Sequence, residues 1–205
     1  CHFIDKLDMD LFVSRLSKLP YIHLAEKVPV YKSSYIPNDP DFQVPSKSWH
    51  LDKIDAESAW NISLGCSNVK IAIVDDAVLL DHTDLASNIF TNTSEIPNNG
   101  IDDDGDGYID NFNGWDFVDQ DGEPQIVGGS HGVHVAGIAA AATNNGEGVA
   151  SIGYETLFMP IRAGDGNIIS HGYEAIVYAA DMGCDIINCS WGGFDASSLE
   201  QDVIN

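Results

Sequence analysis

Basic residues are scarce in this chain. Its 205 residues include only 9 Lys and Arg against 32 Asp and Glu, a formal net charge of −23 at pH 7. A surface this negative repels the phosphates of nucleic acids and the headgroups of anionic membranes. We therefore expect no nucleic-acid partner, and we interpret the acidity as the composition of a secreted protein to which bound calcium contributes.

Long apolar runs and a disulfide pattern are also lacking. No segment has the length of a transmembrane helix, so no membrane span is expected. The four cysteines, Cys1, Cys66, Cys184 and Cys189, show neither zinc-site spacing nor a disulfide framework, and we predict small buried side chains. No signal peptide is visible before Cys1. An alternative interpretation of Cys1 is the lipid-anchored start of a bacterial lipoprotein.

A histidine opens a run of small apolar residues. Ser130–Gly137 reads Ser-His-Gly-Val-His-Val-Ala-Gly and continues with alanines to Ala142, which predicts a buried helix with His131 at its N-terminal end. Because a helix N-terminus disfavours positive charge, we expect His131 to stay neutral near pH 7, as a general base must. The alternative is a core histidine with one satisfied hydrogen bond.

A carboxylate ends a short β-branched run. Val69–Asp75 has the pattern of a strand buried on both faces of a parallel sheet. Sites in open α/β sheets form beyond the carboxyl ends of strands, which is where Asp75 lies. An Asp that precedes a His in the chain matches one arrangement of the Ser-His-Asp machinery, although Asp75 is also compatible with a turn cap.

Three segments together resemble one family. VKIAIVDDAVLLDHTDL, SHGVHVAGIAAA and CDIINCSWGG are similar, in this order, to the catalytic-Asp block, the catalytic-His block and the substrate-binding strand of the subtilisin-like serine proteases, or subtilases. The resemblance extends over nearly all of residues 49–205. It implies a three-layer α/β subtilisin-like fold with a mainly parallel sheet, which is incomplete because the C-terminal part is absent.

The resemblance implies a secreted or cell-envelope endopeptidase that acts on peptides or proteins. Asp75 and His131 would be catalytic, and the serine would come from a C-terminal part of the same protease, on the same precursor or a separate chain. An extended substrate would pair with the backbone of two segments. Their residues are Ser190, Trp191, Gly192, Gly166, Asn167 and Ile168.

Three positions depart from the family pattern. Asp76 and Ala77 stand where the family usually has Thr or Ser and then Gly, and Val133 replaces a Thr between the two histidines. These departures motivate an alternative function. In that alternative the chain is a catalytically degenerate subtilase that binds a peptide or partner chain.

An acidic loop lies between the Asp and His blocks. Carboxylates alternate around glycines in Asn98–Asn113, a pattern that lets a loop wrap a hard cation with oxygens. We expect Ca²⁺, because so many carboxylates repel one another without a counter-ion; the alternative is a solvated acidic turn. The candidate ligands are Asp102, Asp104, Asp106, the carbonyl of Tyr108, Asp110 and Asn113.

A second calcium site is implied by the resemblance alone. Thr143–Val149 follows the histidine helix, where the family has a calcium loop. The implied ligands are the side chains of Asp84 and Asn145 and the carbonyls of Thr143, Glu147 and Val149. The alternative is a Gly-rich helix exit.

The remaining pattern divides the chain into three parts. Residues 1–32 resemble the end of a subtilase propeptide, with a helix over 9–19 and a strand over 21–31, a small α+β segment. Residues 33–48, with three prolines, are expected to be a linker. Residues 49–205 form the N-terminal part of the catalytic domain.

Alternating elements are expected after the histidine helix. The pattern predicts a strand over 157–162, an exposed edge strand over 164–170, a helix over 173–182 and a strand over 186–190. This alternation implies right-handed crossovers and a parallel sheet.

Overall fold

A computed structural model describes residues 8–27, 35–193 and 198–204 of the chain. They belong to two compact units, Cys1–Ser33 and Ser34–Asn205. No helix in these ranges is long and apolar enough to cross a membrane.

The described part of the first unit contains one helix, α1 (Met9–Leu16). Asp8 caps it, because its Oδ1 accepts hydrogen bonds from the backbone N–H groups of Asp10 and Leu11. The expected strand over 21–31 is not formed in residues 21–27, and its remainder lies outside the described residues. A strand needs a neighbour for its ladder hydrogen bonds, and the described residues of this unit provide none.

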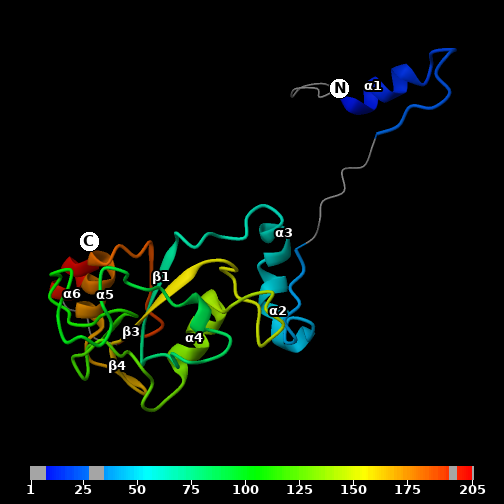
Figure 1. The fold of residues 1–205 in the computed structure, drawn as a ribbon. Coiled ribbons are helices and arrows are strands. Elements are labelled where there is room, and N and C mark those ends of the chain that lie inside the picture. Colours follow the sequence, from blue (N-terminus) through cyan, green and yellow to red (C-terminus); the bar gives the residue numbers. More distant parts are fainter. Residues whose placement is uncertain (1–7, 28–34, 194–197, 205) are drawn as a thin grey trace. The chain divides into compact units, whose positions relative to one another are not determined.

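A parallel sheet forms the centre of the second unit. Its strands are β1 (Lys70–Asp75), β2 (Trp115–Asp116), β3 (Leu157–Arg162) and β6 (Ile186–Asn188), in the order β2-β3-β1-β6. The paired strands β1 and β3 are labelled in Figure 1. In the register of β1 and β3, Lys70 lies opposite Leu157 and Asp75 opposite Arg162. The predicted α/β class and parallel sheet are confirmed.

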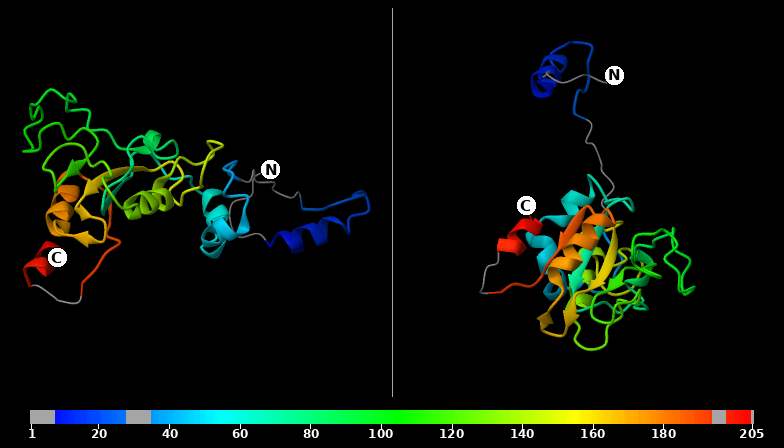
Figure 2. Two further views of the ribbon diagram at one scale, coloured as in Figure 1. Left: turned by 90° about the horizontal axis from the view of Figure 1, so that it is seen from below. Right: turned by 90° about the vertical axis from the view of Figure 1, so that its left-hand side faces the viewer.

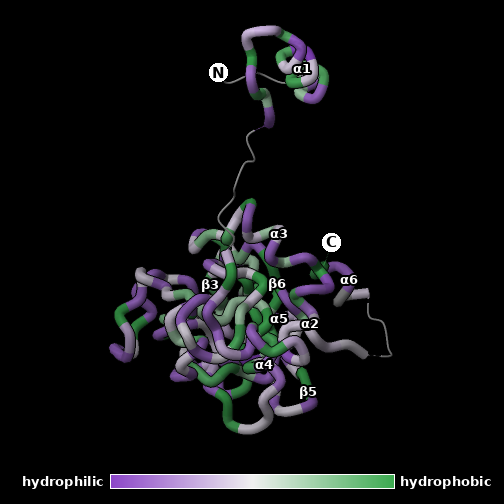
Figure 3. Tube along the Cα trace, turned by 90° about the vertical axis from the view of Figure 1, so that its right-hand side faces the viewer, coloured by the Kyte–Doolittle hydropathy of each residue, from purple (hydrophilic) through white to green (hydrophobic). Residues whose placement is uncertain are grey.

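Two helices cover opposite faces of this sheet. Ile71 and Ile73 of β1 pack in the core beside α4 (His131–Ala140), whereas Ala72 and Val74 pack in the core beside α5 (Gly172–Asp181). Alternation along one strand therefore fills both cores. Hydrophobic colour gathers along the strands in Figure 3, and two further views of the layers are given in Figure 2.

Smaller elements surround the sheet. They are α2 (Pro45–Lys53), α3 (Ala56–Trp60), the 3-10 helix η1 (Ala86–Asn88), the hairpin of β4 (Gly164–Asp165) and β5 (Ile168–Ile169), and α6 (Ser198–Ile204). The helix α2 begins inside the segment expected to be a linker, because proline favours the first helical position.

The cysteine prediction was wrong for two positions. Cys66 and Cys189 are exposed, while Cys184 is half-buried and burial raises its pKa to about 11. All three are free thiols, and Cys1 lies outside the described residues. Cys66 is in the turn before β1, and Cys189 follows β6, an edge strand of the sheet, which explains their exposure.

Candidate active site and cation-binding loops

The sheet brings Asp75 and His131 together at the carboxyl end of β1. Asp75 is the last residue of this strand and His131 is the first residue of α4. Asp75 Oδ1 lies 2.8 Å from His131 Nδ1. The carboxylate side chain is only 2% exposed and the imidazole is 55% exposed. A buried carboxylate thus holds one ring nitrogen while the ring itself remains open to solvent.

The pKa of His131 is raised above its ordinary value. The hydrogen bond to Asp75 is the largest cause, burial opposes it, and the negative charges of Asp75 and Asp76 add to the increase. The helix N-terminus acts in the opposite direction. A carboxylate at hydrogen-bond distance outweighs the partial charge of a helix end.

The segment after β6 lies beside the end of β1. The indole Nε1 of Trp191 donates a hydrogen bond to the carbonyl of Val74 at 2.9 Å, and its ring packs edge-on against Tyr173. Ser190 and Gly192 are exposed. Trp191 is therefore fixed next to Asp75, and its neighbours present accessible backbone.

The expected edge strand over 164–170 is instead a tight hairpin. Asp165 pairs with Ile168, and Gly166 and Asn167 form the turn. The φ angle of Gly166 is +55°, as the first position of a type II′ turn requires. Of the predicted substrate-binding residues, Gly166 and Asn167 lie at the tip and Ile168 is exposed.

A carboxylate outside the acidic motif organises the acidic loop, which projects from the sheet in both views of Figure 2. Glu95 is buried, and its Oε1 accepts hydrogen bonds from the backbone N–H groups of Asp103 and Asp104. A cluster of three carboxylates results, in which one oxygen of each lies within 4.8 Å of the others: Glu95, Asp102 and Asp104. Three hard oxygen donors at this spacing fit a Ca²⁺ ion.

The other predicted ligands of this loop lie outside this three-carboxylate cluster. Asp110 accepts from the backbone N–H groups of Asn99 and Gly100, and Asp106 accepts from Tyr108 N–H. The ring of Tyr108 packs against Trp115 and Tyr178 and so ties the loop to the core. Asp106, Tyr108, Asp110 and Asn113 are not part of the three-carboxylate cluster.

The loop after α4 gathers around two buried carboxylates. Asp84 accepts hydrogen bonds from Asn145 Nδ2 at 2.8 Å and from Val149 N–H at 2.9 Å. Desolvation by burial raises the pKa of Asp84, and the charge of Asp39 adds to it. Asp39, which the sequence analysis missed, is fully buried and accepts from the N–H groups of Asn144 and Asn145.

The two remaining candidates lie on the same loop. The hydroxyl of Thr143 contacts Ser151 Oγ at 3.1 Å, and Glu147 N–H donates to Asn145 Oδ1 at 2.8 Å. Carboxylate and amide oxygens are ligands that suit Ca²⁺, although Asn145 presents its Nδ2 to Asp84 and its Oδ1 to Glu147 N–H.

Comparisons with known proteins show the family of the chain. Residues 66–204 match the model of the subtilase family, Peptidase S8. The chain belongs to the subtilase family. It is similar to the halolysin of Haloferax mediterranei (36% identical, covering 88% of this chain and 31% of the relative) and to the thermitase of Thermoactinomyces vulgaris (37% identical, covering 83% and 53%).

A solved subtilase-like structure supports the same fold. The chain matches a protease from Pseudoalteromonas arctica with a TM-score of 0.60 and 29% identity, over 82% of this chain and 55% of that one. This subtilase chain spans between about a third and about half of the length of the two curated relatives.

A strained alanine follows the acidic pair of this subtilase. Ala77 is buried and has a φ angle of +106°, a region that favours glycine. We expect Ala77→Gly to raise the free energy of unfolding by about 1 kcal/mol, because glycine adopts this angle without strain. Urea denaturation measures the change. Ala72→Gly, in the middle of β1, is the control and should lower the free energy of unfolding; the idea fails if both variants lose stability equally.

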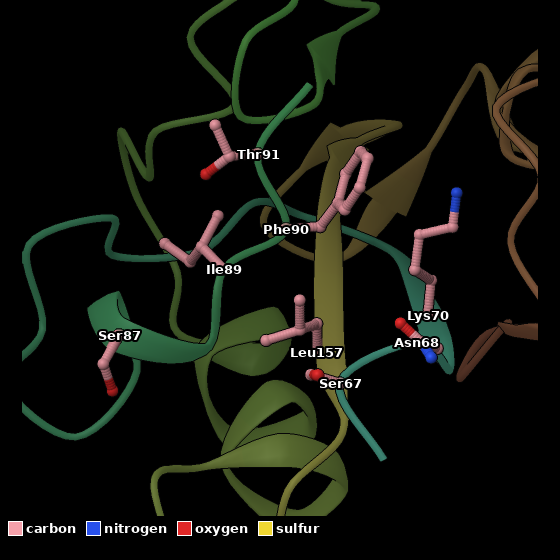
Figure 4. Close-up of a pocket in the computed structure, with 8 residues that line it drawn as sticks. All are labelled: Ser67, Asn68, Lys70, Ser87, Ile89, Phe90, Thr91 and Leu157. Atoms are coloured by element: carbon pink, nitrogen blue, oxygen red, sulfur yellow. The ribbon is translucent and has the colours of Figure 1, made fainter. Parts of the chain in front are cut away.

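One pocket near the sheet lies away from Asp75 and His131. A pocket of about 410 Å³ lies at the opposite end of β1, where Lys70, Phe90 and Leu157 point toward it (Figure 4). Lys70 begins β1 and Asp75 ends it, so the two ends lie roughly 16 Å apart. This pocket therefore plays no part in the chemistry of Asp75 and His131.

Proposed function

We propose that this subtilase is part of a secreted, calcium-stabilised serine endopeptidase that hydrolyses peptide bonds with an Asp-His-Ser triad. The observation that supports it is the 2.8 Å contact between Asp75 Oδ1 and His131 Nδ1 at the carboxyl end of β1. Two of the three triad side chains meet there, and the imidazole remains accessible for a third.

The proposed mechanism assigns separate roles to the two residues. A serine from the C-terminal part of the protease attacks the substrate carbonyl, and His131 Nε2 accepts its proton. Asp75 keeps the proton of the neutral ring on Nδ1 and stabilises the imidazolium that forms. His131 then gives the proton to the leaving amine. Backbone N–H and amide donors stabilise the oxyanion.

The proposed substrate is an extended peptide. Exposed backbone at residues 190–192 and at the hairpin tip of residues 166–168 offers hydrogen bonds to a peptide that lies between them. Backbone pairing gives affinity with few demands on sequence. Trp191, fixed against β1, would form one wall of this path.

A fluorophosphonate probe tests the proposed activity. On the full-length protein we expect covalent labelling of one serine, and the labelling should be lost in the His131→Ala variant because an unactivated serine reacts poorly. Absence of labelling in a folded, peptide-binding protein would instead support the degenerate binding module that Asp76, Ala77 and Val133 suggest.

We propose Ca²⁺ at Glu95, Asp102 and Asp104, and a second ion beside Asp39, Asp84 and Asn145. A ligand present at 100 times its Kd adds about 2.7 kcal/mol to the free energy of unfolding, which corresponds to a Tm increase of roughly 8 °C. Chelation should remove this increase, as measured by thermal unfolding with and without added Ca²⁺.

A matched pair of variants locates the first calcium site. Glu95→Gln should reduce the calcium-dependent increase in Tm, whereas Glu155→Gln, an exposed change on a different loop, should leave it intact. A Tm that is independent of Ca²⁺ and of chelator would contradict both sites.

The proposed location is outside the cytoplasm. Relatives from Natrialba magadii and Xanthomonas campestris carry the word extracellular in their names. We further propose that residues 1–32 are the end of a propeptide, since α1 lies in a unit of its own. N-terminal sequencing of the mature protein tests this second point.

A further inference from the structure

We propose that Asp76 is a positioning residue of the catalytic site, whose carboxylate caps the helix that begins with His131. This inference rests on the proposed endopeptidase function. It assigns a role to a residue that departs from the family pattern and that would otherwise indicate a degenerate site.

The geometry of the Asp76 carboxylate carries the proposal. Its Oδ1 accepts a hydrogen bond from Gly132 N–H at 2.7 Å, and its Oδ2 accepts one from His131 N–H at 3.3 Å. Both donors belong to the first turn of α4, where helix N–H groups have no partner within the helix. Because Asp76 is buried, with 1% exposure, water does not supply these bonds.

The residue that usually caps such a helix does not do so. Ser130 stands at the N-cap position, but its side chain makes no capping hydrogen bond. Asp76 replaces it from the end of β1. Two consecutive aspartates therefore hold His131. Asp75 holds the ring through Nδ1, and Asp76 accepts from the backbone N–H.

Two glycines make room for this carboxylate. A Cβ at Gly129 would lie 2.4 Å from Asp76 Oδ2, and a Cβ at Gly132 would lie 3.0 Å from Asp76 Oδ1. The φ angle of Gly129 is +84°, which also favours glycine. The backbone around Asp76 thus fits an aspartate closely.

The charge of Asp76 adds a second, measurable effect on His131. It raises the pKa of the imidazole together with Asp75. The other ionisable groups near the pair add little charge: burial raises the pKa of the Cys189 thiol, and Arg162, opposite Asp75 in the sheet, is paired with three carboxylates. His134, one turn along α4, is exposed.

The test compares Asp76→Asn with Asp76→Thr in the full-length protein. An Asn carbonyl still accepts from Gly132 N–H, but the amide cannot accept from His131 N–H and carries no charge. We expect kcat to fall about tenfold to a hundredfold with little change in KM. Removal of a nearby anion lowers the pKa of His131. The acidic limb of the pH profile of kcat/KM should therefore move about half a pH unit downward.

Proton NMR titration of the His131 ring provides a readout that does not need activity. Its pKa should fall in both variants, while Asp52→Asn, an equal charge loss on α2, should leave it unchanged. If Asp76→Asn fails to fold, Asp76→Thr, the residue usual in the family, carries the same expectation.

The outcomes separate this proposal from the proposed function. An unchanged His131 pKa and an unchanged acidic limb in the variants, with an active wild-type enzyme, would overturn the role of Asp76 alone. An inactive wild-type protein whose His131 pKa still falls on substitution would contradict the endopeptidase and support the placement of the Asp76 charge beside His131.

Discussion

Replacing His131 with alanine should lower kcat/KM of the full-length protein by a factor of about 10⁴ to 10⁶. No described residue other than His131 has a ring nitrogen hydrogen-bonded to Asp75. Without the imidazole, the serine proton has no acceptor and the Asp75 carboxylate remains buried without a cationic partner in the transition state. Steady-state hydrolysis of a chromogenic peptide measures the loss.

His134→Ala is the matched control for this experiment. His134 lies on the same helix, one turn later, and is exposed. We expect its variant to keep wild-type activity, and circular dichroism should show that both variants are folded. Equal activity of the His131→Ala variant and the wild type would end the catalytic assignment.

Replacing Arg162 with methionine should destabilise the second unit by about 3–5 kcal/mol, because it leaves a buried carboxylate without its cation. The Arg162 side chain is 3% exposed, and its Nη1 lies 2.6 Å from Asp116 Oδ2, whose side chain is 1% exposed. Nη1 also pairs with Asp119, and Nη2 pairs with Asp165. Burial alone would lower the pKa of Arg162, but the three carboxylates raise it above its ordinary value.

Asp119→Asn is the appropriate comparison, since the Asp119 side chain is 60% exposed. Exposed ion pairs contribute about 0–1 kcal/mol, so this variant should differ little from the wild type. Urea denaturation of both variants measures the two free energies of unfolding. A loss below 1 kcal/mol for Arg162→Met would show that Asp116 keeps adequate partners without the guanidinium.

The central elements could be predicted because their signals are local. The buried strand that ends in Asp75 and the small-residue helix that begins at His131 are visible as patterns in the sequence. In a parallel α/β sheet the carboxyl ends of the strands lie at one edge, so the topology predicts that Asp75 and His131 meet there. The residues 157–162 were likewise predicted as a strand with the bounds observed for β3.

The missed features depend on contacts between distant segments. Glu95 lies outside the alternating carboxylates of the acidic loop, and Asp39 lies in a stretch that prolines marked as a linker. Only the folded chain shows that Glu95 turns back to accept from the N–H groups of Asp103 and Asp104, and that Asp39 accepts those of a loop more than 100 residues away. The strand β2 has two residues and therefore no periodicity to detect. The upward shift of the His131 pKa was also missed, because it depends on a hydrogen bond to Asp75, 56 residues earlier in the chain.

The position of β1 between β3 and β6 has a consequence for biosynthesis. Both partners are made long after β1 itself, so in a ribosome-bound chain this apolar strand has no β3 to pair with until residue 162 has been translated, and its other edge has no β6 until residue 188 has been translated. Contacts of such long sequence separation slow folding and expose the nascent strand to aggregation. Chaperone binding during synthesis should therefore concentrate on residues 70–75.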